Sequence, residues 1–499
     1  MEVSLSKKEE EVVENFLKKK NLPLNRAVTF DDVALPEKYS DIRSRSEINN
    51  FKTNLIQGEL DLNIPFISAN MESVTGAELI IALQREGGLG ILPQTLPTEE
   101  KAKILEKVKR DSCARIEKPI TISPDSSMDK AKEKMSKFNI NTLIVSREGR
   151  LIGILSKRDW FYGDQKGKVE EFMSSNDLIT APEDIDFEKA RTILKENKIE
   201  KLPLVDEKNN LKGLMTARGL FYKKNHPKAL RNKKGQFIRT GAIGVGRKFG
   251  EKRLEDVRKQ KEKGIQALLI DTARANSINT KDAIEKIKSE FPDMPLIAGN
   301  VSTPEGAKFL FDMGVDTVKV GVGPGSACTT RETGIGVPQL TAVAKCASLK
   351  KLYDDKRIIA DGGISSAGDA AKALIGGADA LMIGSLLAGT EESAARSYST
   401  YIEELSAEVT VKDYEGSASF AAQKKRANRD DLDKIRRPEG IKKQVPVVGT
   451  VKDRIGELLD GLRSSMSYLG VRNLKELKEN GSFLLQTSSG FSEGVDVHN

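Results

Sequence analysis

The sequence is poor in histidine, cysteine and long apolar runs, and each shortage excludes a class of protein. The 499 residues contain two histidines, His226 beside a proline and His498 next to the end, which disfavours Ser-His-Asp or Cys-His catalysis. Three cysteines cannot form a disulfide framework, and no Cys-x-x-Cys pair suggests zinc. No apolar run approaches the roughly 18 residues of a membrane helix. Any nucleophile or proton carrier must therefore be cysteine, threonine, tyrosine or a charged side chain.

The charge pattern narrows the location and the partners. Residues 1–20 are charged throughout and lack the apolar stretch of a secretory signal, which predicts a cytoplasmic protein without a membrane partner. The formal net charge of +8 is modest for so long a chain. It suits anionic small ligands better than nucleic acid, which requires a dense basic face.

Short apolar runs ending in small or polar residues alternate with helix-length stretches, as in strand-helix repeats. The predicted strands are residues 64–68, 89–92, 242–245, 267–270, 296–298, 317–320, 358–360 and 380–383. Eight such units predict a (β/α)8 TIM barrel of the α/β class.

The second and third predicted strands are separated by a long insert that contains an internal repeat. Residues 121–156 and 180–216 each read as an extended segment, an amphipathic helix, a strand, a turn and a strand. A duplication of this kind indicates one structural unit used twice. We expect the barrel to be built from residues 21–112 and 229–499. The insert would be residues 113–228, with copies at about 118–167 and 174–224.

The repeated unit resembles the tandem CBS (Bateman) module. In that family a G-x-x-[S/T]-x-x-D segment places a hydroxyl and a carboxylate near the phosphate and ribose of a nucleotide. The first copy matches this segment with Gly153, Ser156 and Asp159. The second copy has Gly219 in place of the carboxylate. The resemblance implies an adenine or guanine nucleotide at the first copy, and the alternative is a structural or oligomerising insert that binds nothing.

Polar and glycine-rich segments follow the predicted barrel strands, where the active site of this fold is built. They are Ser68–Met71, Asp271–Thr272, Gly299–Asn300, Gly321–Ser326, Asp361–Gly363 and Gly384–Ser385. Glycines after the last three strands let backbone amides approach a phosphate. The alternative, that they only form tight turns, is weakened because three such segments occur in register.

The loop after the sixth strand is the most informative segment. Cys328 follows Gly-x-Gly-Pro-Gly-Ser, whose residues cannot pack around a core thiol. Backbone donors, the hydroxyls of Thr329 and Thr330, and Arg331 nearby favour a thiolate, which predicts a covalent nucleophile. Cys113 and Cys346 lie in helical patterns and are expected to be buried.

The chain resembles the inosine monophosphate dehydrogenase and guanosine monophosphate reductase family over nearly its whole length. The motifs that carry the resemblance are residues 29–33, 64–71, 87–90, 298–301, 321–339, 360–364, 384–385, 438–441 and 461–465. The family carries its CBS pair at the same place, between strands two and three.

This resemblance implies a role for each matching residue. Cys328 would attack C2 of a purine monophosphate, with Thr330 beside it as a proton relay. The implied substrate-binding residues are Ser68, Met71, Ser326, Asp361, Gly362, Gly363, Gly384, Ser385, Tyr414, Gly416 and Glu439. The implied nicotinamide-binding residues are Asp271, Thr272 and Asn300.

The resemblance also implies a monovalent cation, K+, and an oligomer. The cation would be held by carbonyls of Gly323, Gly325 and Cys328, completed by a segment containing Glu493 from a neighbouring subunit. The family habit and this shared site indicate a homotetramer, with an octamer paired through the CBS modules as the alternative.

Both family reactions use the cysteine adduct and a hydride transfer, so the direction depends on other residues. The dehydrogenase activates water with an Arg-Tyr pair on a flap, but here Arg429 is followed by Asp430, within the charged stretch 424–437. Asn70 and Gln94 resemble the CBS-containing bacterial reductase branch, as does the segment 490–494. Against this, the usual acid of the reductase is replaced by Phe420, although Glu415 is close.

We favour an NADPH-dependent GMP reductase that converts GMP to IMP and ammonia. One alternative is an NAD-dependent IMP dehydrogenase that converts IMP to XMP. The other is a catalytically silent nucleotide sensor, which the intact Cys328-Thr-Thr330 segment disfavours.

Overall fold

The computed structural model describes residues 3–111, 115–138, 140–160, 166–233, 235–402, 407–419 and 440–495. The chain forms two compact units. The first comprises Met1–Lys109, Lys228–Asn232 and Phe237–Asn499, and the second comprises Arg110–Pro227 and Lys233–Gln236. Cys113, Glu439 and the flap candidate 424–437 lie outside the described residues.

The first unit is built around an eight-stranded parallel sheet in the order β13-β14-β15-β16-β17-β18-β4-β5. These strands are β4 (Phe66–Ser68), β5 (Leu89–Gly90), β13 (Thr240–Ile243), β14 (Ala267–Asp271), β15 (Leu296–Val301), β16 (Thr317–Val320), β17 (Arg357–Asp361) and β18 (Ala380–Ile383). A parallel bridge between Ile91 and Thr240 joins the two outer strands. The sheet therefore closes, and the predicted TIM barrel is confirmed.

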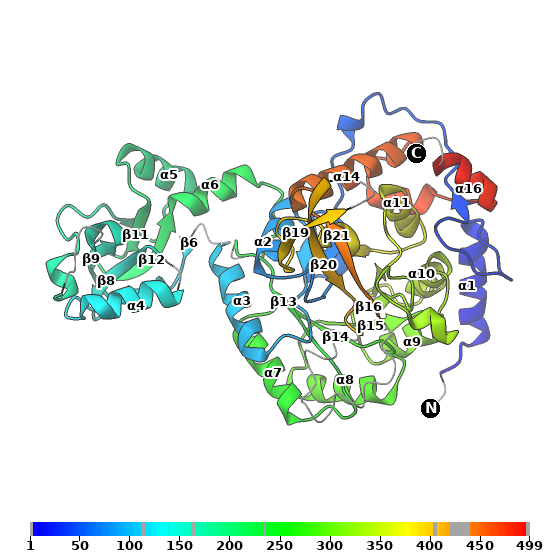
Figure 1. The fold of residues 1–499 in the computed structure, drawn as a ribbon, viewed down its shortest axis with the longest axis horizontal. Coiled ribbons are helices and arrows are strands. Elements are labelled where there is room, and N and C mark those ends of the chain that lie inside the picture. Colours follow the sequence, from blue (N-terminus) through cyan, green and yellow to red (C-terminus); the bar gives the residue numbers. More distant parts are fainter. Residues whose placement is uncertain are drawn as a thin grey trace. The chain divides into compact units, whose positions relative to one another are not determined.

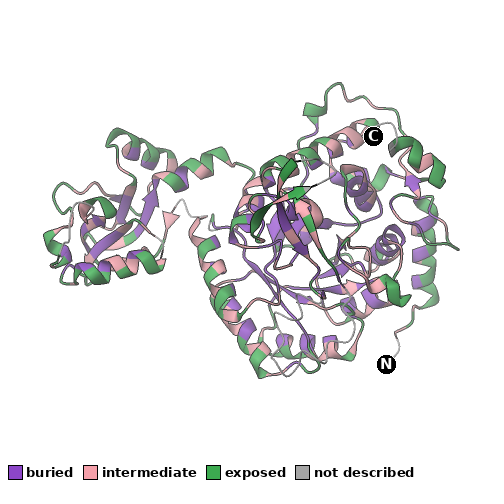
Figure 2. Cartoon of the chain, viewed as in Figure 1, coloured by how far each residue is buried: buried purple, intermediate pink, exposed green. Residues whose placement is uncertain are grey.

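Helices surround this barrel (Figure 1). They are α1 (Lys7–Lys19), α2 (Ala77–Glu86), α3 (Thr98–Asp111), α7 (Glu251–Glu262), α8 (Ile278–Glu290), α9 (Pro304–Asp312), α10 (Gln339–Ser348), α11 (Ala367–Ile375) and α12 (Ser385–Ala388). Successive strand residues point alternately into the barrel interior and outward to the core between strands and helices, as in other closed barrels. Ala267 and Leu269 of β14 face the interior cluster, whereas Leu268 and Ile270 pack toward the helices. Figure 2 shows the buried residues gathered along the barrel strands.

A hairpin of β2 (Thr53–Ile56) and β3 (Leu60–Leu62) contributes Leu55 and Leu62 to the interior core. Thr53 Oγ1 donates to the carbonyl of Asp379 at 2.7 Å, immediately before β18. Thr317 Oγ1, at the start of β16, donates to the carbonyl of Leu55. The hairpin therefore covers the amino-terminal ends of the strands, opposite the end where a barrel active site lies.

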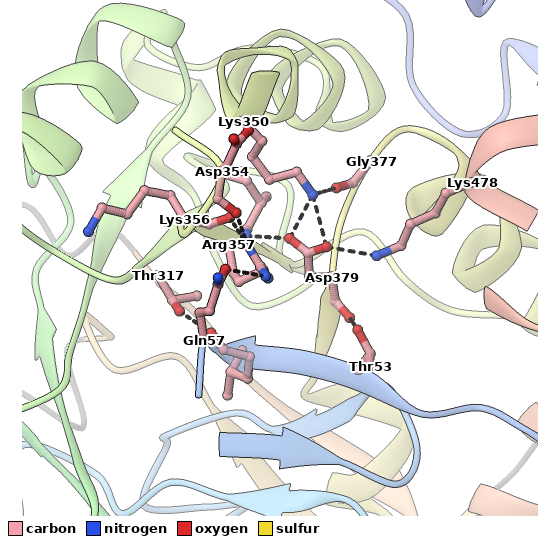
Figure 3. Close-up of polar contacts among 12 residues, drawn as sticks. Thr53, Gln57, Thr317, Lys350, Asp354, Lys356, Arg357, Gly377, Asp379 and Lys478 are labelled. Carbon is pink, nitrogen blue, oxygen red and sulfur yellow. Dashed lines mark hydrogen bonds and ion pairs between the residues drawn. The ribbon is translucent and has the colours of Figure 1, made fainter. Parts of the chain in front are cut away.

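A buried ionic cluster lies at the same end, around the carboxylate of Asp379 (Figure 3). Lys350 Nζ, in the turn η5 (Leu349–Lys351), donates to both carboxylate oxygens at 2.8 and 2.7 Å. Lys478 Nζ of α15 (Leu474–Asn480) donates at 2.7 Å, and the amide of Ile358 at 2.8 Å. Burial alone would raise the pKa of Asp379, but the two ammonium charges lower it to about 2.

The second unit repeats one topology twice. Its elements are β6 (Arg115–Ile116), β7 (Thr121–Ile122), α4 (Met128–Phe138), β8 (Thr142–Arg147), β9 (Arg150–Ser156), η2 (Lys157–Trp160), η3 (Val169–Glu171), β10 (Ala181–Pro182), α5 (Phe187–Glu196), β11 (Lys201–Val205), β12 (Leu211–Thr216) and α6 (Ala217–Asn225). In each half a short strand pairs in parallel with the first strand of an antiparallel hairpin. The repeated sequence thus corresponds to a repeated fold.

The remaining elements belong to the first unit. They are β1 (Val33–Ala34), η1 (Arg45–Glu47), η4 (Thr330–Thr333), β19 (Ser397–Ile402), β20 (Ala407–Glu415), β21 (Lys442–Pro446), α14 (Val451–Tyr468), β22 (Leu484–Leu485) and α16 (Ser488–Val495). Strands β19, β20 and β21 form an antiparallel sheet, and β22 pairs with β1. Among the described helices, none combines the length and apolar character needed to cross a membrane.

Candidate active site

The thiol of Cys328 lies in the loop after β16 and is partly exposed. Its Sγ is 3.2 Å from Thr330 Oγ1, and its amide donates to the carbonyl of Gly325 at 2.9 Å. The loop also contacts the segment that follows the flap candidate. The amide of Ile441 donates to the carbonyl of Ala327, and Cys328 forms a bridge with Gly440. The structure therefore pairs the predicted nucleophile with the predicted relay hydroxyl. By contrast, Cys346 on α10 is fully buried, and burial raises the pKa of its thiol.

Tyr414 reaches the same loop from β20 and is 4% exposed. Burial raises the pKa of its hydroxyl to about 12, and a hydrogen bond with Ser326 opposes this shift. A Cβ atom at Gly384 would lie 2.7 Å from the Tyr414 hydroxyl. Only glycine at the end of β18 leaves room for that hydroxyl. Three of the expected substrate-binding residues, from separate strand ends, thus meet at one point.

Other expected substrate-binding residues surround this point. Ser68, at the end of β4, is fully buried, with its Oγ 2.8 Å from Thr75 Oγ1. Gln339 Nε2 donates to the carbonyls of Val320 and Asp361 at 3.0 and 3.1 Å, which holds the ends of β16 and β17 together. Asp361 is followed by Gly362 and Gly363. The remaining expected residues are Met71 after β4, Ser385 at the start of α12, and Gly416 after β20, whose amide donates to the carbonyl of Ile441.

The carboxylate of Asp271, at the end of β14, is the centre of a second group of polar side chains. Its Oδ2 accepts from Asn70 Nδ2 at 2.9 Å and from Gln94 Nε2 at 3.0 Å. Thr272 follows, and its amide donates to the carbonyl of Gly299 at 2.8 Å. Asn70 and Gln94, which are far apart in the sequence, therefore donate to the same carboxylate.

Asn300 contacts both the Asp271 group and the ends of the strands nearer Cys328. Its amide donates to the carbonyl of Thr272 at 2.6 Å. Its side-chain Nδ2 donates instead to Asp361 Oδ2 at 2.9 Å and to the carbonyl of Gly321 at 2.6 Å. Asn300 was expected beside Asp271, yet its side chain points to the carboxylate expected to hold the ribose.

Lys319 is a site residue that the sequence reasoning missed. Its Nζ lies 2.6 Å from Asp361 Oδ2 and 3.1 Å from Asp271 Oδ1. Burial lowers the pKa of this lysine, but the charges of Asp271 and Asp361 outweigh burial and keep the pKa above its ordinary value. In the sequence it is a lone charge within a strand, and nothing local indicates which way it points.

The residues expected to hold K+ are only partly brought together. Gly323, Gly325 and Cys328 share one loop, whereas Glu493 is exposed on α16. In the described part of the chain, no three His, Cys, Asp or Glu side chains cluster as a metal site would require. Neutral carbonyl oxygens of one loop fit a monovalent cation better than a transition metal.

The fold and the site define a barrel enzyme whose strand ends carry a partly exposed thiol, a group of carboxylates and several glycine-rich segments. The family description "IMP dehydrogenase / GMP reductase domain" matches residues 27–498. The chain belongs to this family of purine nucleotide oxidoreductases, which use a nicotinamide cofactor.

Individual relatives carry both names. The inosine-5'-monophosphate dehydrogenase of Aquifex aeolicus is 42% identical over 480 residues, covering 94% of this chain and 95% of the relative. The inosine-5'-monophosphate dehydrogenase of Nitrosopumilus maritimus is 38% identical over 484 residues, covering 95% of this chain and 98% of the relative. Among solved structures, a cysteine-to-alanine variant of the GMP reductase of Trypanosoma brucei, in complex with guanosine 5'-monophosphate, superposes with a TM-score of 0.84. It is 30% identical and covers 94% of this chain and 98% of that one.

Proposed function

We propose that this protein is an NADPH-dependent GMP reductase. The observation that carries the proposal is the convergence of Asn70 and Gln94 on Asp271. Both residues match the reductase branch of the family. Because they donate to the same carboxylate, the two matches describe one structural feature. The flap sequence agrees, because Arg429 lacks the following tyrosine with which the dehydrogenase activates water.

The residues around Asp271 fit a nicotinamide carboxamide. An ionised carboxylate offers about four acceptor sites, and the described donors Asn70, Gln94 and Lys319 use three of them. One site is left for an N–H donor of the ligand. When bound, NADPH would supply the hydride. Asp271 would orient the carboxamide, with Thr272 and Asn300 beside it.

The chemistry at C2 would belong to Cys328 and Thr330. Sulfur adds to C2 of GMP, and the amino group leaves as ammonia, so a C–S bond replaces a C–N bond. Hydride then reduces C2, and departure of the thiolate releases IMP. Thr330 Oγ1 lies 3.2 Å from the thiol, and it would accept the thiol proton and pass it toward the leaving group. Tyr414, Ser326, Asp361 and the strand-end glycines would hold ribose and phosphate.

IMP dehydrogenase is the second candidate, favoured by the relatives that are 38–42% identical. One assay separates the candidates. Purified protein is given GMP with NADPH, and separately IMP with NAD, while nicotinamide absorbance is followed. Loss of NADPH with release of ammonia supports the reductase. Formation of NADH from IMP and NAD instead identifies a dehydrogenase. No change of absorbance in either arm supports the catalytically silent nucleotide sensor.

We further propose that the second unit is a CBS module that binds an adenine or guanine nucleotide in its first half. Asp159, in η2, accepts from the amide of Ser156 at 2.5 Å, so the carboxylate lies beside Ser156 at the end of β9. In the second half Thr216 Oγ1 accepts from the amide of Gly219 at 3.0 Å, and no carboxylate is present at that position. Calorimetry with ATP and GTP tests whether only the first half binds.

The cation and the oligomer complete the proposal. Carbonyls of Gly323, Gly325 and Cys328, together with Glu493 of a neighbouring copy, would hold K+, and such a shared site requires an assembly such as a homotetramer. Sedimentation of the purified protein with and without K+ would show whether the cation and the assembly are linked.

A further inference from the structure

Lys319 occupies the mouth of the barrel between the two groups of site residues. It belongs to β16, its side chain is 4% exposed, and its ammonium contacts both Asp361 and Asp271. The two carboxylates belong to β17 and β14. One ammonium therefore spans strands that do not neighbour each other in the sheet.

The neighbouring strand, β15, has a glycine where it lies against Lys319. A Cβ atom at Gly299 of β15 would lie 2.5 Å from both the Cβ and the carbonyl oxygen of Lys319. Such contacts are too short for any side chain, so glycine at this position is what permits the lysine. Asn300, the next residue, donates through Nδ2 to the same Asp361 oxygen, Oδ2, that Lys319 contacts.

We propose that Lys319 is a positioning residue that couples nucleotide binding to nicotinamide binding. The inference rests on the proposed function only in assigning Asp361 to the nucleotide and Asp271 to the nicotinamide. It does not depend on the direction of the reaction. When a ligand draws one carboxylate into place, the shared ammonium follows, and the second carboxylate is ordered for its own ligand. Binding of either ligand then favours binding of the other, as linkage requires.

An ion pair that only stabilises the fold would behave differently, and the chain provides a matched control. Lys101 on α3 is also buried, and its Nζ donates to Asp256 at 2.8 Å and to the carbonyl of Ala242 at 2.9 Å. Lys101→Met removes a buried ammonium from a carboxylate outside the site. Both variants are expected to lower the unfolding temperature, but only Lys319→Met is expected to change the coupling.

The experiment measures equilibrium binding with the full chain in a Cys328→Ala background, so that no turnover occurs. The dissociation constant of GMP is determined alone and with saturating NADP+, and that of IMP alone and with NAD+. The parent should bind nucleotide at least about fivefold more tightly with cofactor present, within the usual range of coupling factors. In Lys319→Met this coupling factor should fall toward one. The dissociation constants of GMP and of IMP should both rise. Lys319→Arg should retain part of the coupling, and Lys101→Met all of it.

Two outcomes overturn the inference. The first is a parent protein without coupling for either ligand pair, and the second is coupling that survives Lys319→Met unchanged. Coupling seen with IMP and NAD+ but not with GMP and NADP+ would support Lys319 while overturning the reductase assignment. If Lys319→Met does not fold, Asp271→Asn replaces it. That variant should weaken GMP binding although Asp271 is assigned to the other ligand, and an unchanged GMP dissociation constant would refute the coupling.

Discussion

Asp379 at the amino-terminal ends of the barrel strands offers the sharpest test of how this fold is stabilised. Asp379→Asn keeps the size of the side chain but removes the charge shared by Lys350 and Lys478 (Figure 3). The lowering of the Asp379 pKa from 3.8 to about 2 corresponds to about 2 kcal/mol. The upper limit is set by the two partly buried ammonium groups that lose their counterion, because breaking a buried pair costs about 3–5 kcal/mol in all. We expect a loss of about 2 to 5 kcal/mol in the free energy of unfolding.

The single tryptophan makes the assay selective. Trp160 lies in the second unit, so its fluorescence follows that unit, whereas far-UV circular dichroism is dominated by the helices of the barrel. In urea, with an m value of roughly 3 kcal/mol per molar, the dichroism midpoint of Asp379→Asn should fall by roughly 0.7 to 1.7 M. The tryptophan midpoint should stay in place. Equal shifts of both signals, or no shift in the dichroism, would refute the reasoning.

A control and a pH series sharpen this test. Asp354→Asn alters an exposed carboxylate whose residue contributes its backbone carbonyl to Arg357 in the same cluster, so its effect should be within about 0.5 kcal/mol. The folded pKa of Asp379 is depressed, so its contribution is complete above pH 4 and is lost as pH falls through 2. The deficit of Asp379→Asn relative to the parent should therefore shrink across that window.

Four further outcomes are expected. Cys328→Ala should abolish turnover in either direction while nucleotide binding by calorimetry persists; surviving turnover would exclude the covalent adduct. Thr330→Val should lower kcat by about 100-fold or more, the usual size of a proton-transfer contribution, with little change in the dissociation constant of GMP. Asp159→Ala should remove ATP or GTP binding by the second unit, and unchanged affinity would exclude the proposed regulatory site. Replacing K+ by a large organic cation such as tetramethylammonium should depress the steady-state rate, whereas an unchanged rate would argue against the carbonyl site.

Much of the fold followed from the sequence because each barrel strand is a short apolar run with a polar end. The third strand begins two residues before its predicted start, at Thr240, whose hydroxyl donates to the carbonyl of Gly90 at 2.6 Å inside the barrel. A polar residue satisfied in this way looks like a loop residue from sequence alone. The repeat in the second unit was readable because α4 and α5 carry clear amphipathic patterns between their strands.

The sequence allowed the members of the candidate site to be proposed, but it indicated little about the contacts between them. The loops after the strands made Cys328, Asp361 and Asp271 candidates, because barrels place their chemistry there. Lys319 could not be identified, since a charge within a four-residue strand gives no sign of whether it faces the interior. Its partners are set by the order of the strands and by the space at Gly299, which only the closed barrel defines.

The two ends of the barrel combine lysine and aspartate in opposite proportions, which supports the proposal that ligands bind at the carboxyl-terminal ends of the strands. Asp379 receives four hydrogen bonds from the described residues, which fills the acceptor sites of a carboxylate. At the mouth one ammonium serves two carboxylates, and Asp361 Oδ1 receives no hydrogen bond from the described part of the chain. The mouth therefore keeps a negative charge and open acceptor sites, which attract hydroxyl and amide donors and repel a phosphate. We therefore expect a nucleotide bound there to turn its ribose toward Asp361 and its phosphate toward the glycine-rich ends of β17 and β18.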